Sequence, residues 1–271
     1  MQINLEDKYK LENGIRFLTG TQALVRIPLV QIRKDNKNNL KTACYISGYR
    51  GSPLGGYDQQ ILNNIDYLKA NNINFQPGIN EELAATSLWG TQQSNLRGEG
   101  KYDGVFGIWY GKGPGVDRAG DALKHVNLAG TSKYGGVLAL MGDDHICESS
   151  TTSHQSEFAM IDAMIPFFNP SGVQEILDYG LFGIHLSRKS GCWIGIKCVH
   201  DNVSSGATVD LNENRFSIKD INSEIVPEEG LNIRLNDTPQ AKEHRLHYHK
   251  IKVVKEFCKI NKLNEIKYNF S

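Results

Sequence analysis

The sequence predicts an α/β fold: a three-layer sandwich in which a mainly parallel six-stranded sheet lies between helices. Six short apolar segments alternate with helical segments at intervals of roughly 30 residues. Short, continuously apolar strands are typical of parallel sheets that are buried on both faces. After Val209 the sequence becomes polar and turn-rich, so the sheet is expected to end there.

The order of the elements follows from the apolar pattern. Strands are expected at residues 43–47, 73–75, 105–110, 137–141, 165–168 and 193–199. Helices are expected at residues 20–33, with a kink or restart at Pro28, at 58–69, from Glu81 onward, at 117–128 and at 173–187. In the segment 58–69, Ile61, Leu62, Ile65 and Leu68 recur on one helical face.

Three regions are expected. Residues 1–210 form the sheet domain, residues 211–240 a linker with Pro227, Gly230 and Pro239, and residues 241–271 the helical start of a further region. Residues 241–262 have the pattern of a basic amphipathic helix with a broad apolar stripe and no aromatic residue on its charged face. Packing on a neighbouring domain is therefore favoured over nucleic-acid binding.

Bulk composition excludes several classes of protein. The chain has 271 residues and a formal net charge of zero, so no global field favours nucleic acid. The sequence contains neither an 18-residue apolar run nor a secretory leader, so no membrane association is expected. The five cysteines include no CxxC pair, which indicates the reducing cytoplasm and disfavours a structural zinc or iron–sulfur site here.

Glu81 is the first candidate for chemistry. Asn80 has the character of a helix N-cap, and Glu81 and Glu82 fall in the first helical turn. Both carboxylates would complement the helix dipole there. Alternatively, Glu81 lies at the carboxyl end of a buried strand, where ligands bind in open α/β sheets, and handles a proton.

Two glycine-rich loops follow other strands. Residues 48–53 offer backbone N–H groups, Arg50 and Ser52 for an anion, although an ordinary βα turn fits as well. Residues 111–117 have neither the P-loop nor the dinucleotide-binding spacing. Their glycines suit close backbone approach to a flat ligand or another subunit, and an ordinary tight turn fits nearly as well.

Residues 142–157 are rich in polar side chains. They include the potential metal ligands Asp143, Asp144, His145, Cys147, Glu148, His154 and Glu157. These ligands follow no established zinc or calcium spacing, so the lining of a cofactor pocket is favoured and no metal site is expected.

With these loops in order, the chain resembles the amino-terminal part of the indolepyruvate ferredoxin oxidoreductases, in their long single-chain form. These enzymes belong to the thiamine-diphosphate-dependent 2-oxoacid oxidoreductases. The resemblance covers nearly the whole chain. It is densest in LTGTQALVR (18–26), ISGYRGSPLGG (46–56), FQPGINE (75–81), WYGKGPGVDR (109–118), GDDH (142–145) and HQSE (154–157).

The resemblance implies the pyrimidine-binding domain of the thiamine-diphosphate fold. In the family, a glutamate at the position of Glu81 shares a proton with N1′ of the aminopyrimidine. Ser52 matches a hydroxyl residue that holds the substrate carboxylate next to Tyr49, and we add Arg50 as an ion partner. The remaining residues expected at the cofactor are Gly51, Pro53, Asn80, Lys112, Gly113, Asp143 and His145.

The resemblance also implies parts that are not found in this sequence. The family holds diphosphate and Mg²⁺ through a second domain with a Gly-Asp-Gly motif. Residues 142–144 do not supply it, because Asp144 replaces the second glycine with a carboxylate that would repel phosphate. A [4Fe-4S] cluster is expected elsewhere in the full enzyme, and this chain is expected to be a fragment that is inactive alone.

The implied full enzyme converts an aryl 2-oxo acid and coenzyme A to the acyl-CoA and reduces ferredoxin. A homodimer or a partner chain is expected, because such cofactor sites form between two domains. Two alternatives stay open: an oxidoreductase or decarboxylase for another 2-oxo acid, and a non-catalytic stand-alone pyrimidine-type binding module.

Overall fold

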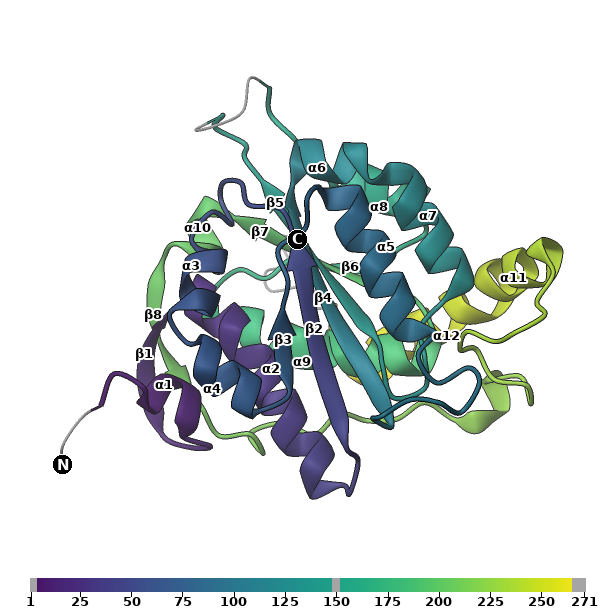
Figure 1. Ribbon diagram of the computed structural model, residues 1–271, viewed down its shortest axis with the longest axis horizontal. Helices are drawn as coiled ribbons and strands as arrows, with labels where there is room; N and C mark the ends of the chain where they lie inside the picture. The colour runs from purple at the N-terminus through teal and green to yellow at the C-terminus, as the bar shows by residue number, and fades with distance from the viewer. Residues whose placement is uncertain (1–3, 148–151, 265–271) are drawn as a thin grey trace, which may run out of the picture.

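A six-stranded sheet with all strands parallel divides the molecule into three layers (Figure 1). The computed structural model describes residues 4–147 and 152–264. The strands are, in spatial order, β3 (Ile73–Phe75), β2 (Thr42–Gly48), β4 (Gly104–Lys112), β5 (Val137–Asp143), β7 (Ile194–Val199) and β6 (Phe167–Phe168). The predicted fold class is confirmed.

Helices cover both faces of the sheet and enclose two apolar clusters (Figure 1). One layer contains α2 (Gly20–Lys37), α3 (Tyr57–Leu62), α4 (Ile65–Ala70) and α9 (Val173–Ser190). The other contains α5 (Glu81–Gln92), α6 (Gly113–Arg118), α7 (Gly120–Ala129) and α8 (Glu157–Asp162). Among the described residues, no helix combines the length and apolar character needed to cross a bilayer.

A second, antiparallel sheet of two strands was not predicted. It pairs β1 (Ile15–Thr19) with β8 (Gly206–Asp210). Leu18 and Val209 are fully buried, whereas Ile15 and Phe17 are mostly exposed. The short elements α1 (Asp7–Lys10), α10 (His200–Val203) and a 3₁₀ turn (Ser223–Ile225) complete the connections.

Two predicted helices differ from the structure. The predicted helix 58–69 is wrong as one element, because it is interrupted at Asn63 and Asn64 between α3 and α4. Of the two alternatives predicted at Pro28, a kink or a restart, the restart is wrong, because α2 is a single helix with Pro28 inside it. The start of α2 is well defined, because Thr19 forms a capping box with Gln22.

The carboxyl-terminal helical segment packs on the same core. It consists of α11 (Pro239–Arg245), a π-helical stretch (Leu246–Lys250) and α12 (Ile251–Ile260). The Phe257 ring of α12 lies 6.3 Å from the Phe182 ring of α9. Residues 265–271 of the predicted third region lie outside the described residues, so its role as the start of a further domain stays a prediction.

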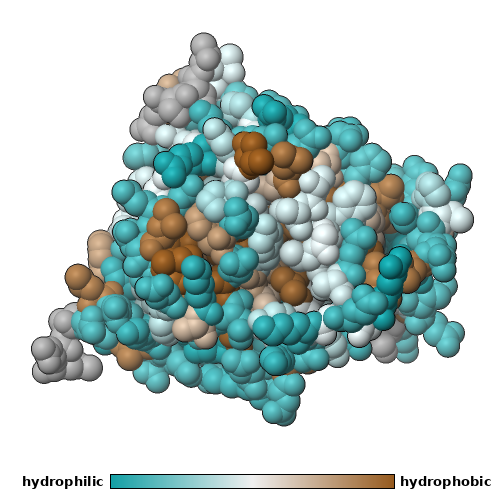
Figure 2. Space-filling model, in the orientation of Figure 1, coloured by the Kyte–Doolittle hydropathy of each residue, from teal (hydrophilic) through white to brown (hydrophobic). Residues whose placement is uncertain are grey.

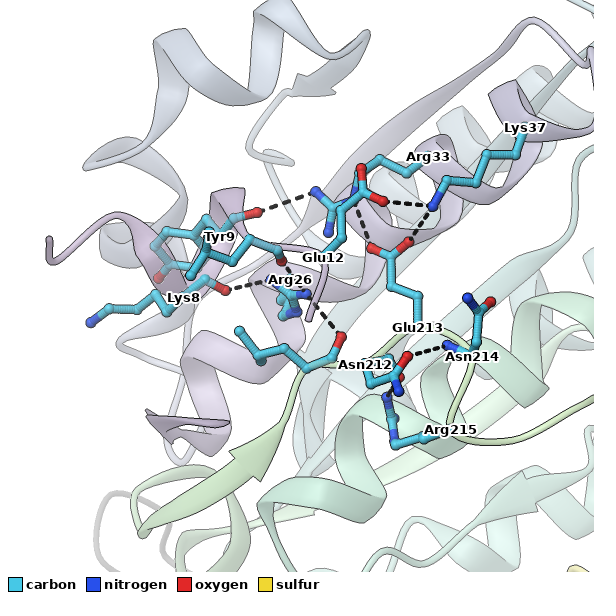
Figure 3. Close-up of polar contacts among 12 residues, drawn as sticks. Lys8, Tyr9, Glu12, Arg26, Arg33, Lys37, Asn212, Glu213, Asn214 and Arg215 are labelled. Carbon is cyan, nitrogen blue, oxygen red and sulfur yellow. Dashed lines mark hydrogen bonds and ion pairs between the residues drawn. The ribbon is translucent and has the colours of Figure 1, made fainter. Parts of the chain in front are cut away.

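Arg26 and Arg33 of α2 hold two distant segments of the chain, near residues 8–11 and at Glu213 (Figure 3). Arg26 is fully buried and donates to the backbone oxygens of Lys8 and Leu11, both at 2.7 Å. Arg33 pairs with Glu213 at 2.7 Å, which holds the start of the predicted linker. Arg26, which belongs to one of the resembling motifs, therefore has a structural role in this chain.

Lys250 is fully buried and connects the ends of two helices. Its Nζ donates to the backbone oxygens of Asn127 at 3.3 Å and Gly191 at 3.1 Å. These carbonyls lie at the C-terminal ends of α7 and α9, where backbone oxygens lack partners within the helix. Burial lowers the pKa of Lys250 from 10.5 to about 8.

This pKa makes stability depend on pH. Between pH 8 and 10.5 the unfolded chain holds a proton on Lys250 that the folded chain has released, so the free energy of unfolding should rise with pH. The full rise is about 3 kcal/mol. Urea unfolding from pH 7 to pH 10 measures it. Lys250→Met should abolish the rise, whereas Lys252→Met, at an exposed lysine, should keep it. The same slope in both variants would contradict this assignment.

Candidate functional site

The strand order reverses direction between β2 and β4. From β2 the chain continues to β3 on one side, and from β4 it continues to β5 on the other side. Ligands of open α/β sheets bind at the carboxyl ends of the strands at such a reversal. The segments 48–53, 76–81 and 111–115 all start from this edge of the sheet. The topology thus brings together most of the residues that the sequence predicts for the site.

Glu81 begins α5 at this edge. The Asn80 side chain accepts a hydrogen bond from the Leu83 N–H at 2.8 Å and caps the helix, as predicted. Glu81 is only 8% exposed, whereas Glu82 is exposed to solvent. The Trp109 indole N–H donates to the Glu81 backbone oxygen at 2.9 Å and fixes the start of the helix on β4. Of the two neighbouring glutamates, the structure therefore turns Glu81 inward.

Glycines make room for the Glu81 side chain. A Cβ atom at Gly115 would lie 2.4 Å from Glu81 Oε1, and one at Gly111 would lie 3.2 Å from Glu81 Cγ. Real Cβ atoms do not approach a neighbour as closely as 2.4 Å. The glycines of this loop accordingly accommodate the Glu81 side chain of the same protein, a role that was not predicted for them.

The Glu81 carboxyl group has no hydrogen-bond or ion-pair partner within residues 4–147 and 152–264. Several other buried carboxylates have partners within the fold, whereas Oδ1 of Asp58 is fully buried without one in the described part of the chain. Asp35, for example, accepts from Arg188, Gln31 and Thr42 at 2.7–2.8 Å. Neither Glu81 carboxyl oxygen is among the fully buried side-chain atoms that lack a partner in this part of the chain, so the carboxyl group is still within reach of solvent and of a ligand.

The loop after β2 lies against β4 and β5. The Tyr49 backbone N–H donates to the backbone oxygen of Tyr110 at 3.1 Å, and Gly51 packs on the Lys112 side chain. Pro53 contacts Gly142. Gly51, Pro53 and Lys112 therefore lie near one another, as the predicted site requires.

Arg50 and Ser52 complete this loop. Arg50 Nε lies 3.4 Å from Oδ2 of the buried Asp58, while most of the Arg50 side chain is exposed. Ser52 is half-buried and Tyr49 is 46% exposed. The guanidinium that we assigned to a substrate carboxylate is thus already paired with an acid of this chain.

Asp143 has a structural environment. Its carboxylate is completely buried and accepts from the Ser156 N–H at 3.0 Å and from the Ser156 hydroxyl. Burial raises the pKa of Asp143, although Ser156 and Lys197 oppose this shift. Lys197 also pairs with Glu157. A cofactor contact at Asp143 would have to replace its contacts with Ser156 and Lys197. The pairing of Lys197 with Asp143 and Glu157 was not predicted.

A polar cavity of about 720 Å³ lies next to the candidate site. It is lined by Asp117, His145, Ser153, His154, Gln155, Ser156 and Phe158. His154 Nε2 lies 3.2 Å from Asp117 Oδ2, and the His154 ring packs over Gly113. Residues two apart on a helix point in opposite directions, so His154 at Gly113 and Glu81 at Gly115 lie on opposite sides of the first turn of α6.

Glu81 is not among the residues that line this cavity, and we place the candidate site at Glu81 because its carboxyl group has no partner among the described residues. The exposed His145 belongs to the cavity. Glu148 of the predicted polar loop lies outside the described residues. Within the described part of the chain, no group of three or more His, Cys, Asp or Glu residues is arranged to hold a metal ion.

Comparisons with known proteins support the fold. No family model matches the sequence, and no curated protein matches it. One similar solved structure is the 2-oxoglutarate:ferredoxin oxidoreductase from Magnetococcus marinus with 2-oxoglutarate, coenzyme A and succinyl-CoA bound. Its TM-score is 0.62 at 12% sequence identity, over 90% of this chain and 45% of that chain. The two chains share a fold. The likeness extends over less than half of that oxidoreductase's length.

The contact between Gly115 and Glu81 can be tested by stability. Gly115→Ala should lower the free energy of unfolding by about 1–3 kcal/mol, because the new methyl group overlaps the Glu81 carboxyl group. Gly120→Ala is the matched control, since no atom lies within 4 Å of a Cβ there. It should be neutral or stabilise by up to about 1 kcal/mol. Equal urea midpoints for the two variants would show that Glu81 is not held at α6.

Proposed function

We propose that this chain supplies the aminopyrimidine-binding half of a thiamine-diphosphate site in a 2-oxoacid:ferredoxin oxidoreductase. The observation that carries the proposal is the Glu81 carboxyl group, which is 8% exposed and without a partner among the described residues. It lies at the strand reversal, where α/β sheets bind ligands. The fold shared with an oxidoreductase of this kind supports the same function.

The residues at Glu81 fit an aminopyrimidine ring. A carboxyl group at this position could share a proton between its oxygen and the ring nitrogen N1′. The neighbouring glycines leave backbone atoms, rather than side chains, around the carboxyl group. When bound, thiamine diphosphate supplies the electron sink that decarboxylation of a 2-oxo acid requires.

The diphosphate group and Mg²⁺ would be held by a second domain or chain. Within residues 142–144, only Asp143 was assigned to the cofactor. Its carboxylate is completely buried and already accepts a hydrogen bond from the Ser156 N–H. The candidate site also has apolar surface next to it, since Ile79 is 83% exposed and Leu83 is 51% exposed near the start of α5. Figure 2 shows brown, apolar patches among the polar surface on this face of the molecule. Apolar surface next to a polar site suits a face that a partner domain covers.

For the substrate we propose an aryl 2-oxo acid, indolepyruvate, with Tyr49 and Ser52 at its carboxylate. Arg50 would contribute as a member of the Arg50–Asp58 pair, which reduces its net charge. Coenzyme A would accept the acyl group and ferredoxin the electrons, through a [4Fe-4S] cluster outside this chain. A homodimer would provide the covering domain.

The test is Glu81→Gln in the complete protein or complex that contains this chain. Turnover, followed as 2-oxo-acid-dependent reduction of a viologen dye with coenzyme A, thiamine diphosphate and Mg²⁺, should fall by at least about 10²-fold. Folding and most of the cofactor affinity, measured by calorimetry, should remain, because glutamine keeps the shape of the side chain. Glu82→Gln, at the exposed neighbour, should leave turnover unchanged. Full activity of Glu81→Gln with bound cofactor would refute the assignment.

The same assay separates the alternatives. Faster turnover of indolepyruvate than of 2-oxoglutarate supports the aryl substrate, and the reverse order would assign the chain to another member of the class. Cofactor binding without turnover of any 2-oxo acid would instead indicate a non-catalytic pyrimidine-type module.

A further inference from the structure

An open groove of about 840 Å³ runs between the α8–β6 connection and α12. It lies beside β6, the outer strand of the parallel sheet. Its walls are apolar: Ile161, Met164 and Phe167 line one side, and Ile251, Val254 and Cys258 line the other. The floor is buried, since Val254 is 8% exposed, whereas Ile161 on the rim is 63% exposed.

The polar rim of the groove carries one sign of charge. Lys255, Lys259 and Lys262 border it, and no Asp or Glu lines it among the residues that the structure describes. The whole chain has a formal net charge of zero, so three lysines around one apolar groove are a local concentration of charge. A complementary partner therefore combines apolar side chains with carboxylates.

We propose that this groove binds an acidic amphipathic helix of a partner protein. Lys255 and Lys259 are one turn apart on α12, about 6 Å along its axis. A partner helix lying along α12 would place carboxylates with the same repeat opposite them. Its apolar stripe would contact Ile251, Val254 and Cys258, which also recur at helical spacing.

A helix fits this groove better than an extended peptide. β6 has only two residues, Phe167–Phe168, so an added strand would gain very few main-chain hydrogen bonds. A helix satisfies its own backbone and needs only side-chain contacts. The groove is also open along its length, whereas small-molecule sites enclose most of their ligand.

A membrane surface is disfavoured by the packing of α12. Val253 and Phe257 of α12 are completely buried against the core. Ile251, Val254 and Cys258 of the same helix line the groove. Interfacial helices bind membranes by burying a whole apolar face in the lipid, which α12 does not offer.

The experiment uses a fluorescein-labelled peptide of about 18 residues, about five helical turns, with leucine at every third or fourth position and flanking glutamates. Fluorescence anisotropy with the full chain should show saturable binding. Lys255→Glu combined with Lys259→Glu should raise the Kd at least about tenfold, because two attractions become repulsions. Ile161→Gln should also weaken binding, through the apolar wall.

The control variant combines Lys242→Glu with Lys252→Glu, which makes the same change of charge outside the groove. It should keep the Kd within about twofold, and thermal unfolding should show that both double variants fold. Equal loss of affinity in the two double variants, or no saturable binding, would overturn the proposal. Binding to anionic phosphatidylserine vesicles instead of the peptide would also overturn it and assign the lysines to a lipid surface.

Discussion

The contact between the Glu81 side chain and the first turn of α6 determines the geometry of the candidate site. Glu81 begins α5 after β3, and Gly115 belongs to the helix that follows β4. Because β3 and β4 flank β2, this contact spans the carboxyl end of the strand at which the chain reverses direction. The glycines allow the two helices to start side by side with a carboxyl group between them. Any larger residue at Gly115 would force the carboxyl group or α6 to move.

The partners of the buried carboxylates separate structural acids from the candidate catalytic one. Asp35 is bound by two nitrogens of Arg188, and Asp143 by the backbone and hydroxyl of Ser156. The carboxylates of Asp35 and Asp143 therefore already accept hydrogen bonds from other residues of the fold. Glu81 is 8% exposed, its carboxyl group has no partner among the described residues, and its oxygens are not among the fully buried unpaired atoms. A carboxyl group that the fold has left unpaired and within reach of solvent is available to a ligand.

The sequence predicted those parts of the fold that depend on local pattern. The sheet strands and the cap at Asn80 follow from apolar runs and from residues next to each other. By contrast, β1 and β8 lie about 190 residues apart and are too short to be identified alone. His154 and Lys197 were not assigned because their partners, Asp117 and Glu157, come from elements that only the tertiary fold brings near them. The inward turn of Glu81 rather than Glu82 followed from the resemblance, whereas the glycine contacts that cause it required coordinates.

Several of the buried charged contacts that stabilise the domain lie on the opposite face of the sheet from Glu81. The layer with α2 and α9 is held by buried charges, such as Arg26, Lys250 and the Arg188–Asp35 pair. The layer with α5 and α6 is held mainly by apolar packing around Trp109 and by close helix starts. Two buried charges of this second layer, Asp143 and Lys197, are paired with each other and with Ser156 and Glu157, and they leave the Glu81 carboxyl group free for a ligand. Removing a charged contact from the first layer should therefore change stability without changing the arrangement around Glu81.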